Sequence, residues 1–185
     1  RNDSIQMMVH FEDVLKKEEM MARSNESGTL TFDNFMRVLR RTFPTKGDVP
    51  LQRLERMLLC ETNGTKTVKD VELLGEDENG NQGRCAELLR AQHLTEIEKF
   101  SDEVMESIEQ YRDGLGMLTV NRLREALEAA DPNKSRAEIN RLLSRGLALP
   151  VEDVLMTEAR ATLISVSEFK TRLKNGILKK SPPPT

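Results

Sequence analysis

Tryptophan is absent from the sequence and tyrosine occurs once, so aromatic residues make up only 4% of the 185 residues. Leu, Met, Ala, Glu, Lys and Arg, which are strong helix formers, dominate instead. Hydrophobic residues reach 37%, which is enough for packed cores of modest size and excludes a disordered chain. We therefore expect an all-α fold that forms one domain or two small ones.

Cysteine and histidine are scarce. Cys60 and Cys85 show no short pairing motif, so we expect two reduced core thiols in a cytosolic protein and no disulfide framework. His10 and His93 lie far apart and have no Cys or His cluster nearby, which gives no support for a zinc site or a histidine-activated nucleophile. Both histidines are expected at the surface or at its boundary. Phosphate-cradling glycine loops, G-x-S-x-G and metalloprotease motifs are also missing. The sequence predicts no catalysis, no cofactor and no metal.

A surplus of basic charge and a long apolar run are lacking too. The net charge is -3 and the signs are interspersed, so nucleic acid is not expected as a partner. No apolar run approaches the roughly 18 residues that cross a bilayer, and no signal-peptide pattern opens the chain. We expect a soluble, cytoplasmic protein without membrane insertion. Because the chain starts at Arg1 and closes with SPPPT, we expect it to be a piece of something longer.

An internal repeat organises the chain. The phrases LTFDNFMRVL from Leu30, LTVNRLREAL from Leu118 and ISVSEFKTRL from Ile164 share one design, and KTVKDVELL from Lys66 is a weaker fourth copy. Each begins with a short β-like segment, continues with a residue able to cap a helix, and then shows apolar residues at helical spacing. We expect each phrase to form a short strand and a helix whose apolar face packs inward.

A shift of 88 residues superposes two halves of the sequence, since it places Gly28 on Gly116, Leu30 on Leu118 and Pro44 on Pro132. The two prolines predict helix ends, because proline disfavours helical geometry in the residue before it. In the second half, Asp131 and Ser135 are candidate caps of the helix that follows. The last loop carries about ten additional residues, ALPVEDVLMT, compared with its counterpart.

Between the halves, residues 75–83 read GEDENGNQG and predict a connector or a helix break, and a long helix is expected from about Arg84 to Tyr111. The predicted organisation is an N-terminal lobe at 1–74, a linker and helix at 75–97, a C-terminal lobe at 98–180 and a disordered proline-rich tail at 181–185.

The order of helix, short loop with a central glycine, β-like segment and second helix resembles the EF-hand superfamily. Two pairs of such units, over roughly residues 5–178, resemble calmodulin. The resemblance implies two lobes, each with a short β contact, in which Leu30 lies near Lys66 and Leu118 near Ile164. In a calcium-binding loop of that family, oxygen ligands occupy positions 1, 3, 5, 7, 9 and 12, glycine occupies 6, and a bidentate Glu occupies 12.

None of the four loops carries that set. With Gly28 at position 6, the cation of Arg23 replaces the first carboxylate. With Gly116 at position 6, Tyr111 takes position 1 and Arg122 takes position 12. The sequence therefore predicts that these two loops do not bind calcium.

The remaining loops are also incomplete. With Gly64 at position 6, Lys66 takes the normally apolar position 8 and Asp70 takes position 12. The last loop keeps Glu168 at position 12, but threonine and alanine fill positions 1, 3, 5 and 6. Should a metal bind after all, the candidate ligands are Glu61, Asn63 and Asp70 in the second loop and Asp77, Asn79 and Asn81 in the connector.

We predict a non-catalytic scaffold or adaptor that binds an amphipathic helix of a partner, or of its parent chain, without calcium. Candidate partner-binding residues line the two lobes: Phe11, Phe35, Leu39, Leu123, Leu127, Phe169 and Leu173. Calcium-incompetent arrays of this kind resemble parts of cytoskeletal and axonemal proteins, so the cytoskeleton or the cilium is the expected setting. Two alternatives stay open: a calcium sensor with one irregular site, and a regulatory region of a larger enzyme.

Overall fold

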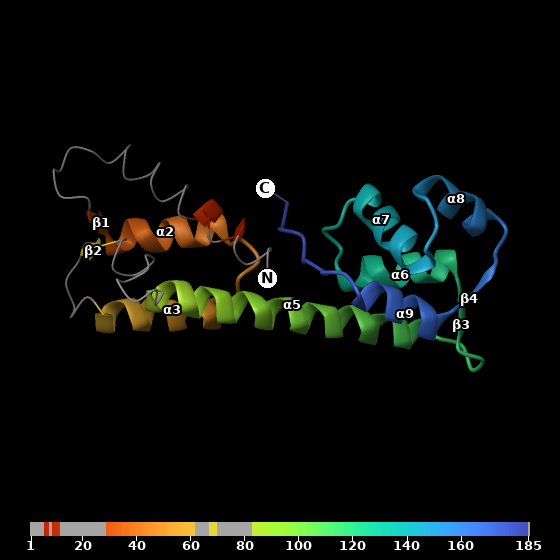
Figure 1. Cartoon of the computed structure of the whole chain (residues 1–185), viewed down its shortest axis with the longest axis horizontal. Helices are drawn as coiled ribbons and strands as arrows, with labels where there is room; N and C mark the ends of the chain where they lie inside the picture. Colours follow the sequence, from red (N-terminus) through yellow and green to blue (C-terminus); the bar gives the residue numbers. More distant parts are fainter. Residues whose placement is uncertain (1–5, 8, 12–28, 62–66, 70–82, 185) are drawn as a thin grey trace. The chain divides into compact units, whose positions relative to one another are not determined.

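The computed structural model describes residues 6–7, 9–11, 29–61, 67–69 and 83–184 (Figure 1). These residues are mostly helical and include two antiparallel sheets of two strands each. The chain divides into two compact units, unit 1 at Arg1–Thr95 and unit 2 at Glu96–Thr185. The expected helical class with a short β contact in each half is confirmed. Among the described residues, no helix is long and apolar enough to cross a membrane.

Unit 1 contains one sheet and the helices that follow its strands. Its elements are β1 (Thr29–Thr31), α2 (Phe32–Thr42), α3 (Asp48–Glu61), β2 (Thr67–Lys69) and the first part of α5 (Arg84–Tyr111). The strands β1 and β2 pair antiparallel. Helix α5 has the bounds that the sequence predicts, and the division between the units falls inside it.

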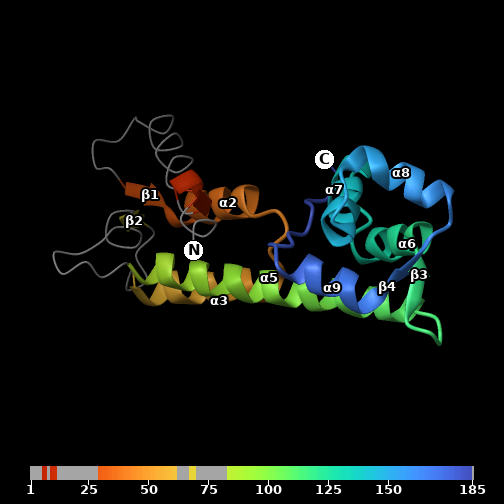
Figure 2. The same cartoon turned by 45° about the vertical axis from the view of Figure 1, so that its right-hand side comes forward.

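Unit 2 contains the second part of α5 and the remaining elements. These are β3 (Met117–Thr119), α6 (Val120–Ala130), α7 (Arg136–Leu147), α8 (Val151–Ala159), β4 (Leu163–Ser165) and α9 (Val166–Lys174). Helix α7 packs against α6, α8 and α9, and α9 lies alongside α5 in both views (Figures 1 and 2). Most of the additional residues of the last loop belong to α8.

The repeat in the sequence is also a repeat in the structure. The pairs β1 and β3, and α2 and α6, have the same lengths and lie 88 residues apart, and α3 and α7 begin 88 residues apart. The last residue of β1, of β3 and of β4 caps the helix after that strand, because its hydroxyl accepts a backbone N–H three residues on. These capping residues are Thr31, Thr119 and Ser165.

Proline ends a helix in both units. The residues before the two prolines, Phe43 and Asp131, leave helical geometry and form the C-caps of α2 and α6. Ser135 caps α7 as predicted, and it forms a capping box with Glu138. Asp131 is not a cap of α7; it closes α6 instead, since its N–H bonds to the carbonyl of Leu127.

The register of one sheet differs from the prediction. Leu118 pairs with Ile164 as expected, but Leu30 pairs with Val68 and not with Lys66, which lies outside the described residues. Valine also suits a strand better than lysine does. The alignment that places Gly64 at position 6 of the second loop is therefore wrong, and the residue that pairs with Leu30 is Val68.

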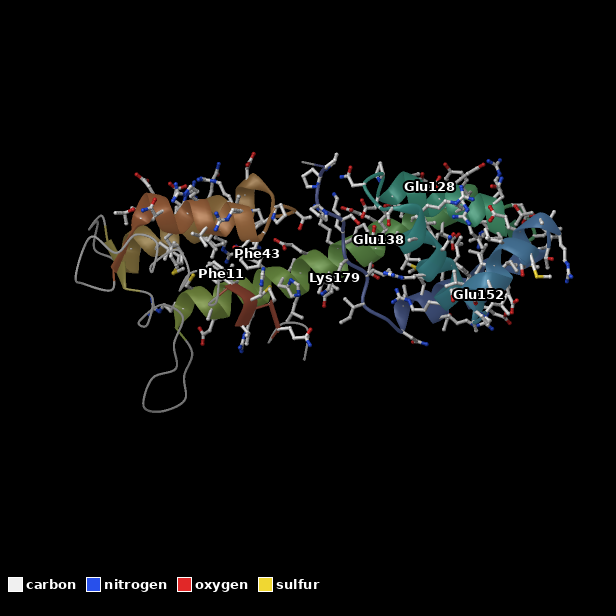
Figure 3. The ribbon with its side chains drawn as sticks, turned by 90° about the horizontal axis from the view of Figure 1, so that it is seen from above. Phe11, Phe43, Glu128, Glu138, Glu152 and Lys179 are labelled. Carbon is white, nitrogen blue, oxygen red and sulfur yellow. The ribbon has the colours of Figure 1, made fainter. Side chains whose placement is uncertain are left out.

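Each unit has its own core. In unit 1, the ring of Phe11 lies 5.9 Å from that of Phe35, edge to face, and 5.3 Å from that of Phe43. Figure 3 labels Phe11 and Phe43. In unit 2, apolar residues of α5, α6, α7 and α9 form one cluster, which also takes in Val154 of α8. Gly146 of α7 lies directly against the ring of Phe169 of α9.

Candidate functional site

The seven predicted partner-binding residues belong to the cores. All of them are almost completely buried: Phe11, Phe35, Leu39, Leu123, Leu127, Phe169 and Leu173. A partner helix could contact them only if a unit opened, which would expose apolar surface to water. Their role in binding stays a prediction that requires such an opening.

The outer face of α8 carries exposed apolar side chains. Leu155 is 49% exposed and Met156 is 55% exposed, and Val151, one turn before Leu155, is also exposed. We call Val151, Leu155 and Met156 the α8 surface. The opposite face of the helix is anchored, because Val154 is completely buried in the core of unit 2. The sequence predicts an insertion at this place but gives no sign that its helix turns apolar residues outward.

A buried ion pair holds α8 against the rest of unit 2. The guanidinium of Arg124 on α6 donates to both carboxylate oxygens of Glu158, from Nε at 3.0 Å and from Nη2 at 2.8 Å. Its Nη1 donates to Asn140 Oδ1 of α7 at 2.8 Å. The hydrogen bond from Arg124 lowers the pKa of Glu158 below its usual value. One side chain thus connects α6, α7 and α8.

The sequence contains a sign of this ion pair that was missed. Arg124 interrupts the apolar stripe of the phrase that begins at Leu118, and the equivalent residue 88 places earlier is Met36, which is buried. A cation inside an apolar stripe requires a buried anion nearby. Arginine takes the place of methionine in unit 2, the unit whose last loop carries the insertion. Glu158 lies near the end of α8, the helix of that loop.

The loop between α5 and β3 is held together by its own side chains. Asp113 Oδ1 accepts the N–H groups of Leu115 and Met117, both at 2.9 Å. The guanidinium of Arg122 lies 5.7 Å from the centre of the Tyr111 ring and forms an ion pair with Glu125 at 2.7 Å. The residues at predicted loop positions 1 and 12 therefore contact each other.

The loop before α9 is likewise occupied by protein contacts. Thr157 and Ala159 belong to α8, and the hydroxyl of Thr157 donates to the carbonyl of Asp153. Glu168, at predicted position 12, is exposed and lies 3.8 Å from Arg172 on its own helix. Predicted positions 1 and 3 thus lie in a helix that the insertion creates.

The remaining candidate ligands lie almost entirely outside the described residues. Glu61 is the last residue of α3, whereas Asn63, Asp70, Asp77, Asn79 and Asn81 fall in segments that the structure does not describe. Within the described ranges, no three His, Cys, Asp or Glu side chains are grouped in a way that could hold a metal ion.

The prediction that both cysteines are core residues is confirmed for Cys85 and wrong for Cys60. Cys85 is buried, and burial raises the pKa of its thiol to about 12, so the thiol is neutral and a poor nucleophile at physiological pH. Cys60 is exposed. It lies near the end of α3 and turns away from the unit 1 core. The histidines follow the prediction, because His10 is exposed and His93 is half-buried.

Comparison with known proteins gives two distant relatives. The chain is 25% identical over 155 residues to mouse Translin-associated factor X-interacting protein 1, which covers 82% of this chain and 22% of that protein. It is 28% identical over 152 residues to the human protein of the same name, covering 76% of this chain and 21% of that protein. The chain spans about a fifth of the length of these curated relatives. No protein-family model and no solved structure matches it, so the EF-hand resemblance stays a prediction from the sequence.

Proposed function

We propose that this chain is a non-catalytic protein-binding module that binds an amphipathic helix of a partner, or of its parent chain, through the α8 surface. The observation that carries the proposal is the exposure of Leu155 and Met156 on a helix that is fixed from behind. Because Val154 and the pair of Arg124 with Glu158 already hold α8, little conformational freedom is lost when a partner binds. Methionine also adapts readily to apolar partner surfaces.

The charge next to the α8 surface indicates the kind of helix that would fit. Glu152 and Asp153 are exposed on the first turn of α8. A partner helix with apolar residues three and four apart and with basic residues beside them would match both features. The names of the two relatives state an interaction with Translin-associated factor X. We infer that Translin-associated factor X is the first candidate partner to test.

Replacing both Leu155 and Met156 with serine is expected to weaken the affinity for Translin-associated factor X by at least about tenfold, because two apolar contacts are lost. Calorimetric titration of the purified proteins measures the change. The matched control is Leu115→Ser, which removes an 85% exposed leucine from a loop and should leave the affinity unchanged. Circular dichroism checks that all variants are folded.

Two results would contradict parts of this proposal. Equal affinity of the double variant and the wild type would exclude the α8 surface as the binding site for Translin-associated factor X. Absence of binding by the wild type would exclude Translin-associated factor X as a direct partner of this segment. The same titration with calcium and with a chelator tests calcium independence, and equal affinities are expected.

The register of β1 and β2 favours a second candidate function, calcium binding by the second loop. With Val68 at the paired position 8, Glu61 and Asn63 move to positions 1 and 3, and Glu72 replaces Asp70 at position 12. This set places glutamate at positions 1 and 12 and an apolar residue at 8, whereas Lys66 takes the glycine position 6. Calcium binding in the micromolar range that is lost in Glu72→Gln would establish this function and contradict calcium independence.

A further inference from the structure

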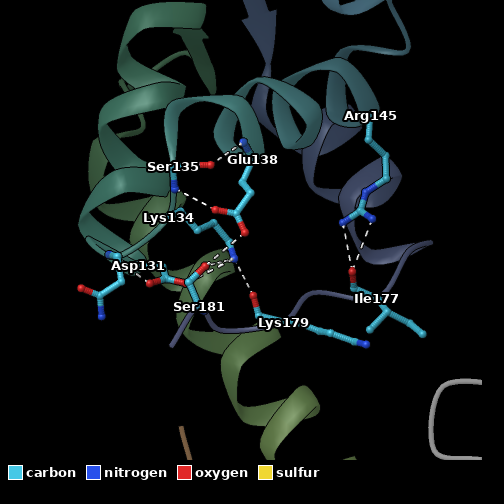
Figure 4. A network of polar contacts seen from close by, with 9 residues as sticks. Asp131, Lys134, Ser135, Glu138, Arg145, Ile177, Lys179 and Ser181 are labelled. Carbon is cyan, nitrogen blue, oxygen red and sulfur yellow. Dashed lines mark hydrogen bonds and ion pairs between the residues drawn. The ribbon is translucent and has the colours of Figure 1, made fainter. Parts of the chain in front are cut away.

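After α9 the chain continues as residues 176–184, which we call the C-terminal strap, and it lies against unit 2 (Figure 4). The side chain of Leu178 is buried in the unit 2 core. The carbonyl of Ile177 accepts from Arg145 at 3.4 and 3.5 Å, and the carbonyl of Lys179 accepts from Lys134 Nζ at 2.5 Å. The strap is therefore held by its main chain and by one apolar side chain. The sequence predicts a disordered tail from residue 181 onward.

Ser181, the first residue of that predicted tail, is only 6% exposed. Its N–H donates to Oδ2 of the buried Asp131 at 2.7 Å. Its hydroxyl accepts from Lys134 Nζ at 3.2 Å and donates to Glu138 Oε1 at 3.5 Å. Figure 4 shows Ser181 between these three charged side chains.

The charged groups around Ser181 carry a net negative charge. Lys134 Nζ forms an ion pair with Asp131 at 3.2 Å, so its charge is already balanced. Glu138 adds a second carboxylate. Hydrogen bonds from Ser135, with a smaller contribution from the charge of Lys134, lower the pKa of Glu138, which keeps its carboxylate ionised at neutral pH. A further anion at the Ser181 hydroxyl would therefore lie beside two carboxylates, those of Asp131 and Glu138, and one ammonium group, that of Lys134.

The sequence around Ser181 fits a protein kinase substrate. Ser181 precedes Pro182 and is the only serine or threonine followed by proline in the 185 residues. Proline favours an extended backbone in the residue before it, and Lys179 and Lys180, both exposed, precede the serine. Once the strap leaves unit 2, this segment presents its hydroxyl in an extended, basic context.

We propose that Ser181 is a phosphorylation site of a proline-directed serine kinase and that the phosphate releases the C-terminal strap from unit 2. The Ser181 oxygen attacks the γ-phosphorus of ATP, a bond from oxygen to phosphorus forms, and the bond to the β-phosphate breaks. ADP leaves, and the hydroxyl proton passes to the base of the kinase. Phosphoserine carries about 1.5 to 2 negative charges at pH 7, which the carboxylates of Asp131 and Glu138 repel. In the docked strap Ser181 is also only 6% exposed, so a phosphate on its hydroxyl would have to displace neighbouring groups.

The first experiment tests the modification. The chain is incubated with a proline-directed serine kinase and ATP, and the phosphorylated residue is mapped by mass spectrometry. Phosphate is expected on Ser181 and absent from that peptide in Ser181→Ala. Leu178→Ala, which loosens the strap, should be modified faster. Absence of phosphate on Ser181 in both the wild type and Leu178→Ala would overturn the assignment.

The second experiment tests the release. Phosphoserine is introduced at position 181 during translation, and NMR measures hydrogen exchange of the residue 181 amide and the methyl shifts of Leu178. Exchange is expected to be at least about tenfold faster than in the wild type, which corresponds to a docking equilibrium weakened by the same factor. Ser181→Ala keeps the N–H that bonds to Asp131 and should stay docked.

A charge variant separates electrostatic repulsion of the phosphate from steric crowding around it. Glu138→Gln keeps an acceptor for the Ser135 N–H but removes one negative charge beside Ser181. In the phosphoserine chain, this variant is expected to slow the exchange of the residue 181 amide again. Unchanged exchange and methyl shifts after phosphorylation would overturn the release of the strap.

Discussion

Replacing Gly146 with alanine is expected to lower the free energy of unfolding of unit 2 by about 1 to 3 kcal/mol. Alanine forms helices better than glycine by about 1 kcal/mol, so a purely local argument predicts the opposite sign. The new Cβ would lie 2.2 Å from Cε2 of Phe169, and 2.5 and 2.6 Å from two neighbouring ring atoms. Because α7 and α9 are in direct contact here, either the ring or a helix has to move.

Urea denaturation measures this effect well. The sequence contains no tryptophan and one tyrosine, Tyr111, which packs against the unit 2 core, so tyrosine fluorescence reports on unit 2 alone. Phe169→Ala should cost about 3 to 5 kcal/mol by itself. In that background Gly146→Ala should cost little, because the ring that it meets is gone. Gly114→Ala is the control, since nothing lies within 4 Å of its added Cβ. Stabilisation by Gly146→Ala would contradict the close packing of α7 on α9.

Replacing Arg124 with alanine is expected to lower the free energy of unfolding of unit 2 by about 3 kcal/mol, because Glu158 keeps a partly buried negative charge without the cation that binds it directly, and only the weaker effect of Arg136 remains. The side chains are 7% and 19% exposed, so water compensates only part of the loss. Arg124→Met should be almost as costly, although methionine occupies the equivalent place in unit 1. Arg124→Met combined with Glu158→Met should recover most of the stability, since two apolar side chains then pack together. Urea denaturation at pH 7 compares the variants.

The ion pair of Arg124 with Glu158 also predicts that the free energy of unfolding of unit 2 depends on pH. The pKa of Glu158 is lowered in the folded chain, chiefly by the hydrogen bond from Arg124. A lowered carboxyl pKa contributes stability above the unfolded value and loses it as the pH falls through the folded value. The stability difference between the wild type and Arg124→Met should therefore shrink below the ordinary glutamate pKa of 4.5. A difference that stays constant down to acidic pH would show that the ion pair contributes little.

The sequence predicts the repeat and its helices well because their signals are local. Proline disfavours helical geometry only in its neighbours, and a capping hydroxyl reaches an amide three residues away. Pro44, Pro132 and Ser135 therefore indicate helix ends from within a few residues, and the long helix expected after the glycine-rich stretch at 75–83 is observed at Arg84–Tyr111. The predicted register of β1 and β2 is wrong because the prediction counts positions from Gly64. A glycine in a turn does not fix which strand residues pair.

By itself, the sequence determined a helical chain of two related halves, with strand and helix bounds 88 residues apart. Only the tertiary structure decided which apolar residues stay accessible: it buries Phe35 and Phe169 and leaves Leu155 exposed. It also joins Arg124 to Glu158 and Asp131 to Ser181, 34 and 50 residues away. Burial and ion pairing depend on distances between elements, which local spacing along the chain does not specify.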